Sequence, residues 1–237
     1  MKFFQDLVEI ITTAEYRNYI FEGFLNTLGI TFIAVVIGLV LGFLVAIIKV
    51  FARANKALAI PNTICNIYTT VFRGTPVALQ LFIFVFALFA IPGFKVYAVI
   101  LCFGVNSGAY VSESIRAGIM SVDGGQMEAG ISLGLSEIKT MKKIILPQAI
   151  KNVIPAIGNE VIALLKETAI ISMVGSTVGT LTFDLNQASS TISYAISDFF
   201  APSIIAALFY LIVVYLFTFL IKIFEKELHK SDKHNWY

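Results

Sequence analysis

Five long apolar stretches limit the fold of this 237-residue chain more than any other feature. Each holds about 20 residues or more, the length that an α-helix needs to cross the hydrocarbon core of a bilayer. They cover residues 23–48, 57–91, 96–115, 148–172 and 201–221. Backbone groups in that core need hydrogen-bond partners within the protein, and a helix supplies them within one segment. The sequence therefore predicts an all-α integral membrane protein with about five transmembrane helices.

Composition and motif content exclude several other classes of protein. Apolar residues make up 58% of the chain and charged residues 14%, against roughly 45–50% and 25% in soluble globular domains. A net charge of +2 is too small to suggest a nucleic-acid partner. The sequence contains no P-loop, and its two histidines, His229 and His234, lie in the charged C-terminal stretch. We therefore expect no catalytic residues, no metal site and no cofactor bound by this chain.

Three regions follow from the distribution of the apolar stretches. Residues 1–22 precede the first stretch, and apolar side chains at helical spacing predict an amphipathic helix over 3–14 that lies on the outer membrane surface. Residues 23–225 form the membrane domain. Residues 226–237 form a charged cytoplasmic tail.

The distribution of Lys and Arg predicts the orientation of the chain. With the N-terminus outside, five spans place the C-terminus inside, and the inner segments then hold twelve of the 17 basic residues. These are Lys49, Arg53, Lys56, Arg116, Lys139, Lys142, Lys143, Lys151, Lys222, Lys226, Lys230 and Lys233. Because cytoplasmic loops carry the excess of Lys and Arg, this orientation is strongly favoured.

Polar residues inside the spans mark a candidate binding site, because each is costly in hydrocarbon unless it is paired or faces water. Several of them, on three different spans, lie near the same depth. They are Arg73 and Thr75 beside the helix break at Gly74-Thr75-Pro76, Asn106 and Ser107 in the third span, and Glu160 at the midpoint of the fourth. The pattern predicts a polar cavity near the midplane of the membrane, as transporters build with broken helices.

The chemistry of these residues suits an amino-acid zwitterion. The planar fork of Arg73 can bind a carboxylate through two hydrogen bonds, and Glu160 can receive an ammonium group. An alternative is structural, in which Arg73 and Glu160 pair with each other or with neighbours to hold the helices together. Glu113 and Arg116, three residues apart, are expected to form a structural ion pair or a gate element.

A polar island over about 118–147 interrupts the apolar pattern. It contains Glu128-Ala129-Gly130, then Gly134 and Leu135, and it ends at Ile144-Ile145-Leu146-Pro147. This spacing resembles the cytoplasmic EAA loop of the permease subunits of bacterial ABC importers. Phe72-Arg73-Gly74-Thr75-Pro76, Tyr110-x-x-Glu113-x-x-Arg116 and Leu164-Leu165-Lys166-Glu167-Thr168 are similar to the polar amino-acid branch of that family, which includes histidine, glutamine and arginine systems.

The resemblance covers about residues 20–225 and implies a complete transport system. In the family, a permease in the bacterial inner membrane pairs with itself or with a sister permease. Two ATPase subunits bind ATP-Mg, and an extracytoplasmic solute-binding protein delivers the substrate. The loop implies a helix over 123–133 that docks on the ATPase, with the coupling residues Asp123, Glu128, Ala129, Gly130, Gly134, Leu135 and Pro147.

Two other classes remain open. A secondary amino-acid transporter would use similar intramembrane charges, but such proteins carry internal repeats, and none is visible here. A structural membrane subunit would need no Arg and Glu near the midplane. The sequence also leaves open which amino acid is carried, whether the permease pairs with itself or a sister, and whether the binding protein is periplasmic or lipid-tethered.

Overall fold

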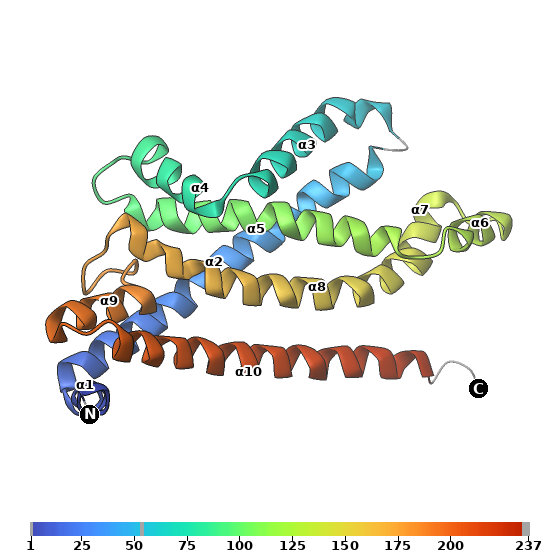
Figure 1. Cartoon of the computed structure of the whole chain (residues 1–237). Helices are drawn as coiled ribbons and strands as arrows, with labels where there is room; N and C mark the ends of the chain where they lie inside the picture. The colour runs from blue at the N-terminus through green and yellow to red at the C-terminus, as the bar shows by residue number, and fades with distance from the viewer. Residues whose placement is uncertain (1, 53–54, 234–237) are drawn as a thin grey trace.

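The computed structural model describes residues 2–52 and 55–233, and these form an all-helical bundle (Figure 1). Helices α5, α8 and α10 run lengthwise beside one another, with α8 between the other two, and α2 crosses them obliquely. The elements are α1 (Lys2–Thr12), α2 (Ala14–Phe51), η1 (Lys56–Leu58), α3 (Ala59–Gly74), α4 (Val77–Ile83), η2 (Phe84–Leu88), α5 (Lys95–Met120), α6 (Gly125–Ser132), α7 (Glu137–Thr140), η3 (Met141–Ile145), α8 (Leu146–Glu167), η4 (Thr168–Val174), α9 (Leu185–Ile196) and α10 (Phe200–Lys233).

Three of the described helices are long and apolar enough to cross a membrane: Ala14–Phe51, Lys95–Met120 and Phe200–Leu228. The helices Lys56–Gly74 and Val77–Leu88 meet these criteria only as a pair, and because they meet at an angle of 109° the pair is either one broken span or a re-entrant loop. The predicted break at Gly74-Thr75-Pro76 is thus confirmed, and the predicted span 57–91 is two helices. Helix α8 holds most of the predicted fourth span, 148–172, and it is more polar than these three helices. Its place between α5 and α10 gives it an inner position in the bundle.

The ends of the chain differ in detail from the sequence-based boundaries. Helix α1 lies where an amphipathic helix is predicted, and it buries Ile10 while Phe4, Val8 and Ile11 stay exposed. Helix α2 begins at Ala14, so it runs without a break through the expected boundary at 22. Helix α10 continues to Lys233, which makes the first part of the expected tail helical; Arg53 and residues 234–237 lie outside the described residues.

Small residues bring α2 and α5 into close contact. A Cβ atom built on Gly42 would lie 2.6 Å from Cγ1 of Val111, and one on Gly38 would lie 2.7 Å from Oγ of Ser107. Side chains at these positions would therefore force the two helices apart. Lipid tails are as apolar as the helices, so the hydrophobic effect does not drive transmembrane helices together, and they associate through close packing of this kind.

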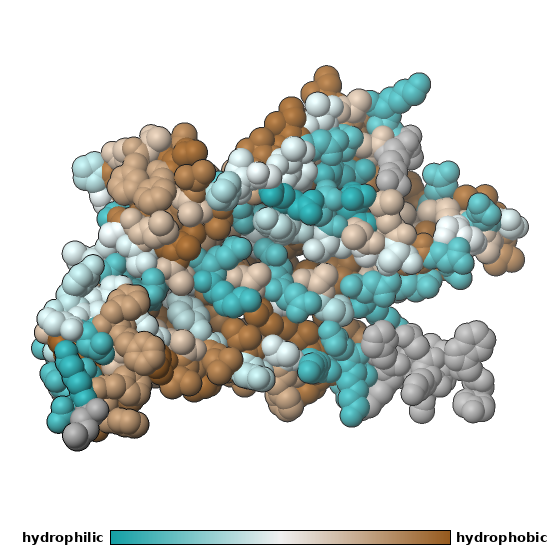
Figure 2. All heavy atoms as spheres, viewed as in Figure 1, coloured by the Kyte–Doolittle hydropathy of each residue, from teal (hydrophilic) through white to brown (hydrophobic). Residues whose placement is uncertain are grey.

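The distribution of polarity is that of a membrane protein. Large apolar side chains are exposed along the outside of α2, α3 and α10, including Phe32, Ile64 and Phe219. Polar side chains such as Thr31, Gln80 and Asn106 are buried. Figure 2 shows hydrophilic side chains gathered between α3 and α5, with hydrophobic ones around the outside. The polar interior is the part of the molecule that the candidate site occupies.

Candidate functional site

Hydrogen bonds from the Gln80 side chain, called the clamp below, fix the geometry of the break between α3 and α4. Pro76 has no N–H group to continue a helix, and Thr75 is extended, with φ −120° and ψ 147°. The amide nitrogen of Gln80 donates to the carbonyl groups of Phe72 and Thr75 at 2.9 and 3.0 Å, and to the Thr75 hydroxyl at 2.8 Å. Gln80 therefore satisfies carbonyl groups that the helix break frees.

Asn106 of α5 belongs to the same clamp. Its side-chain nitrogen donates to the Gln80 side-chain oxygen at 2.8 Å and to the Phe72 carbonyl at 3.2 Å. The Thr75 hydroxyl in turn donates to the Val71 carbonyl at 2.8 Å. The polar atoms of Asn106 and Thr75 are thus engaged in positioning the break. Sequence reasoning placed both residues in the site but missed Gln80, whose place one turn after Pro76 is the signal that could have found it.

Glu160 and Ser107 do meet, as the shared depth predicted. The carboxyl group of Glu160, on α8, interacts with the hydroxyl group of Ser107, on α5, and lies in the electrostatic field of Arg73. Glu167, two turns further along α8, adds a like charge nearby. Within the described residues, no cationic nitrogen lies within 4.0 Å of the Glu160 carboxylate.

Arg73 lies at the end of α3, between two carboxylates. Its nearest carboxylate is Glu113 at 3.9 Å, and its guanidinium lies 5.4 Å from the centre of the Tyr110 ring. The side chain is 44% exposed, so it is held loosely. Such a guanidinium has free donors for a further carboxylate.

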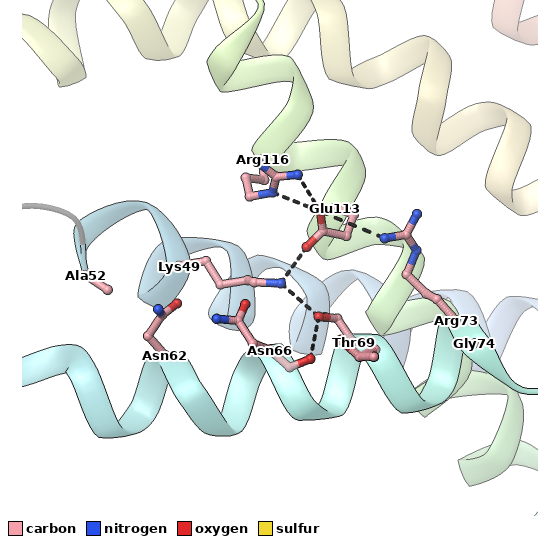
Figure 3. A pocket seen from close by; sticks show the side chains of 10 residues that line it. Lys49, Ala52, Asn62, Asn66, Thr69, Arg73, Gly74, Glu113 and Arg116 are labelled. Carbon is pink, nitrogen blue, oxygen red and sulfur yellow. Dashed lines mark hydrogen bonds and ion pairs between the residues drawn. The ribbon is translucent and has the colours of Figure 1, made fainter.

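Glu113 is the centre of a charged cluster that joins three helices (Figure 3). Lys49 of α2 donates to one carboxylate oxygen at 2.5 Å, and Arg116 donates to the other at 2.8 Å. Arg116 and Arg73 approach Glu113 from opposite sides. The predicted pair of Glu113 with Arg116 is confirmed. Lys49 contributes only to the predicted orientation, because residue spacing along the sequence gives no sign of a contact between residues 64 positions apart.

This cluster lines a cavity of about 780 Å³ between α2, α3 and α5. Polar side chains from α3 form most of the remaining wall, and α3 also presents the backbone of Gly74. The lining residues are Lys49, Ala52, Asn62, Asn66, Thr69, Thr70, Arg73, Gly74, Glu113 and Arg116. A cavity of this size is within the range of small-molecule sites.

The polar island forms a separate helical element at one end of the bundle. Helix α6 is followed by Gly134 with φ +83°, and the backbone N–H groups of Gly134 and Leu135 donate to the carbonyl groups of Ile131 and Gly130 at 2.9 and 3.0 Å. This is the Schellman ending of a helix, which favours glycine at the position of positive φ. The predicted helix and glycine turn are therefore both present.

Most of the predicted coupling residues lie on the surface of this end of the bundle. Asp123, Glu128, Ala129, Gly134 and Pro147 are exposed, Leu135 is half-buried and Gly130 is buried. Asp123 lies just before the helix and accepts a hydrogen bond from the Gly125 backbone N–H at 2.9 Å. Ile131, Leu133 and Ile138 expose apolar side chains beside them, and Leu133 is 82% exposed. The element presents exposed apolar side chains among exposed acidic and basic ones, including Lys139.

Gly130 packs against the next helix of the island. A Cβ atom at this position would lie 2.4 Å from Cγ2 and 2.7 Å from Oγ1 of Thr140, which is buried. Thr140 is β-branched and donates to the Ser136 carbonyl at 3.1 Å, so it has little room to move. Glycine and alanine are therefore not interchangeable here.

The chain is similar to known transport proteins over most of its length. Residues 38–230 match the family described as binding-protein-dependent transport system inner membrane component. The chain is 46% identical over 213 residues to "Putative glutamine transport system permease protein GlnP" of Rickettsia felis, covering 89% of this chain and 93% of that protein. It is 40% identical over 217 residues to "Arginine transport system permease protein ArtQ" of Bacillus subtilis, covering 90% and 94%.

A solved structure has the same fold. The chain resembles a protein in the "Crystal structure of an amino acid ABC transporter with histidines", with a TM-score of 0.81 and 35% sequence identity. The match covers 92% of this chain and 98% of that one.

Proposed function

The chain belongs to the family of binding-protein-dependent transport system inner membrane components, and we propose that this permease subunit of an amino-acid ABC importer carries polar amino acids. The energy comes from ATP-Mg hydrolysed on two separate ATPase subunits. An extracytoplasmic solute-binding protein delivers the amino acid. A second permease, either another copy or a sister chain, completes the pathway.

The observation that supports the substrate proposal is the position of two opposite charges around the broken helix. Arg73 lies in the last turn of α3. Glu160 lies on α8 within the electrostatic field of Arg73, and its carboxyl group interacts with the Ser107 hydroxyl group. A zwitterion needs a cation for its carboxylate and an anion for its ammonium group. These protein charges bind the zwitterion tightly only where water is excluded from them. Glu160 is available for the ammonium because no ion pair engages it among the described residues. The relatives named for glutamine and arginine transport agree with a polar substrate.

The orientation follows from the charge at the two ends of the bundle. Lys49, Arg116, Lys139, Lys142 and Lys143 lie toward the end that carries α6 and α7. The positive-inside rule places that end in the cytoplasm and the α1 and α9 end outside. A reporter fused after Asp123 should then read as cytoplasmic and one at Ser189 as external, and the opposite result would overturn the orientation.

The α6 element is the proposed contact with the ATPase. It lies at the end of the bundle, and α7, η3 and α8 follow it as one continuous helical rod. A movement of α6 is therefore transmitted along α8 to Glu160. Closure of the ATPase dimer on ATP would thus change access to the substrate site, as two-state rigid-body motions do in other proteins.

The test is uptake by the permease reconstituted in proteoliposomes with its ATPase subunit. Labelled L-glutamine, L-arginine and L-cystine are supplied outside together with the binding protein. We expect at least one of them to accumulate, and only when ATP-Mg is present in the lumen. Accumulation driven by a Na⁺ or H⁺ gradient without ATP would contradict the proposal and would identify a secondary transporter.

A further inference from the structure

We propose that the cavity around Glu113 is an exit subsite, in which three cations receive the carboxylate of the amino acid after it leaves Glu160 and before it enters the cytoplasm. The cations are Lys49, Arg73 and Arg116, and Glu113 competes with the substrate for them. The inference rests on the amino-acid import proposed above, and it assigns a second binding position on the same pathway.

The charges of this cluster do not balance. Lys49, Arg116 and Arg73 lie 2.5, 2.8 and 3.9 Å from the Glu113 carboxylate, so three positive charges share one negative charge. Only 8% of the Lys49 side chain and 14% of the Glu113 side chain are exposed, which leaves water little part in screening them. A cluster with two surplus positive charges attracts a second anion.

Arg73 lies between the Glu113 cluster and the Glu160 site. It lies beside the helix break, within 3.9 Å of Glu113 and within the electrostatic range of Glu160. Its side chain is the most exposed of the three cations, at 44%, and its guanidinium also lies 5.4 Å from the centre of the Tyr110 ring. A carboxylate bound to Arg73 at the Glu160 site can therefore reach Lys49 and Arg116 through a change in the rotamer of the Arg73 side chain.

The cavity has a volume and a lining that suit an amino acid. Its volume of about 780 Å³ is large enough for an amino acid with several waters. Asn62, Asn66 and Thr70 line the wall that faces the cations. Their amide and hydroxyl groups offer both donors and acceptors, so they suit the ammonium group and a polar side chain. The site thus has a cationic part and a neutral polar part, as a zwitterion requires.

Glu113 makes the subsite weak, and a weak site is what release needs. An incoming carboxylate must displace Glu113 from at least one cation, so part of the binding energy is lost in that exchange. Sites on a conduction path work when binding is favourable enough for entry and weak enough for departure. Removing Glu113 should therefore strengthen binding from the cytoplasmic side, and removing a cation should weaken it.

The experiment measures inhibition by amino acid on the cytoplasmic side. Proteoliposomes are loaded with ATP-Mg and increasing unlabelled L-arginine or L-glutamine, whichever is transported, and the initial uptake of the labelled amino acid is recorded. Arg116→Gln should raise the half-inhibiting luminal concentration about tenfold, and Glu113→Gln should lower it about tenfold, as expected for one charge-assisted hydrogen bond. Lys222→Gln, which removes an exposed cation on α10 away from the cavity, should leave it unchanged.

Analogues separate the substrate carboxylate from other anions. The decarboxylated amine of the same amino acid, such as agmatine for L-arginine, should inhibit at least about tenfold more weakly, because it lacks the group that the cations bind. Inorganic phosphate in the lumen at matched ionic strength should not reproduce the inhibition; equal potency would make this a general anion site and overturn the assignment.

The remaining outcomes are also decisive. Shifts of Glu113→Gln and Arg116→Gln in the same direction, or no luminal inhibition of the unchanged protein, would overturn the exit subsite. If Glu113→Gln does not assemble, Arg116→Gln measured with the transported amino acid and its decarboxylated amine decides alone. Failure of the unchanged complex to take up any amino acid would instead refute the proposed function.

Discussion

Two carboxylates in the polar interior, Glu113 and Glu160, have opposite surroundings. Glu113 is bound by Lys49 and Arg116 at 2.5 and 2.8 Å and has Arg73 close by. Glu160 meets a hydroxyl group and the like charge of Glu167, and no cation lies within 4.0 Å of it among the described residues.

Glu113 has the surroundings of a structural ion pair, whereas Glu160 has those of a site that can bind a cation. A carboxylate already saturated by cations gains little from a further ammonium group, whereas an unpaired one in a partly dry site gains a great deal. Glu113 therefore joins α2, α3 and α5, and Glu160 is the carboxylate that we propose for the substrate. Four changes test this division, in order of decreasing expected effect.

The largest effect is expected on stability from Glu113→Gln. Removing the carboxylate leaves Lys49 buried without its counter-ion, and breaking a buried pair in this way costs about 3–5 kcal/mol. Thermal unfolding of the purified complex in detergent measures the loss. The double change Glu113→Gln with Lys49→Met should recover much of it, because no uncompensated charge remains. An unchanged melting temperature for Glu113→Gln would contradict the anchoring role.

Glu160→Gln should act on transport instead. The change keeps the shape and polarity of the side chain but removes the charge that we propose for binding the substrate ammonium group. The loss of a desolvated charge-assisted bond is about 1.5–3 kcal/mol, or about ten- to hundredfold in apparent affinity. The half-maximal amino-acid concentration for stimulation of ATPase activity measures it, with a melting curve as control. An unchanged half-maximal concentration would remove Glu160 from the site.

Gly130→Ala should weaken coupling while leaving both carboxylates untouched. The new methyl group would overlap Thr140, and overpacking of this kind costs about 1–3 kcal/mol. Uptake per ATP hydrolysed should fall, with the apparent affinity for the amino acid unchanged. Adding Thr140→Ala removes the two nearest atoms and should restore coupling. A shift in affinity would mean that α6 and the substrate site are not separable.

A third carboxylate, Asp184, should produce the smallest effect. It is fully buried at the start of α9, outside the membrane-spanning helices, where the backbone N–H groups of Gln187 and Asn186 donate to it at 3.0 and 3.3 Å. Burial raises the pKa of Asp184 to about 7, against these hydrogen bonds. The folded state therefore keeps a proton that the unfolded chain has already lost above about pH 4.

The free energy of unfolding should accordingly decrease as the pH rises from the unfolded pKa of Asp184 to its folded pKa. Between pH 6 and pH 8 the contribution of Asp184 to the free energy of unfolding falls by about 1.4 kcal/mol and then levels off above its folded pKa. Melting temperatures of the unchanged complex and of Asp184→Asn, measured across this range, isolate the contribution. If the melting temperature of the unchanged protein instead falls more than that of the variant as the pH is lowered, the sign of the pH dependence is opposite and the raised pKa of Asp184 is refuted.

Local features of the site were predictable from the sequence. The break after Gly74 follows from Pro76, and the turn at Gly134 follows from a glycine placed just after a short helix. The approach of Ser107 to Glu160 followed from their similar depth in two spans. Each of these depends on a property of a few neighbouring residues or on helix length.

Partnerships between helices were not predictable in the same way. Asn106 fell at the right depth, but its side chain is engaged by Gln80 and Phe72. Lys49 belongs to the charged cluster although nothing in its neighbourhood indicates this. Two residues on different helices meet only when the crossing angle and rotation of the helices bring them together, and spacing along one helix carries no such information.

By itself the sequence determined that the chain is a helical membrane protein, where one of its helices breaks, and which segment leaves the bundle as a short capped helix. These depend on apolar length, on a missing N–H group and on a residue that accepts positive φ. Only the tertiary structure decided that Glu113 is saturated by cations while Glu160 is unpaired. That outcome depends on the close packing of α2 against α5 at Gly38 and Gly42, which brings Lys49 beside Glu113 and sets the register of every contact between them.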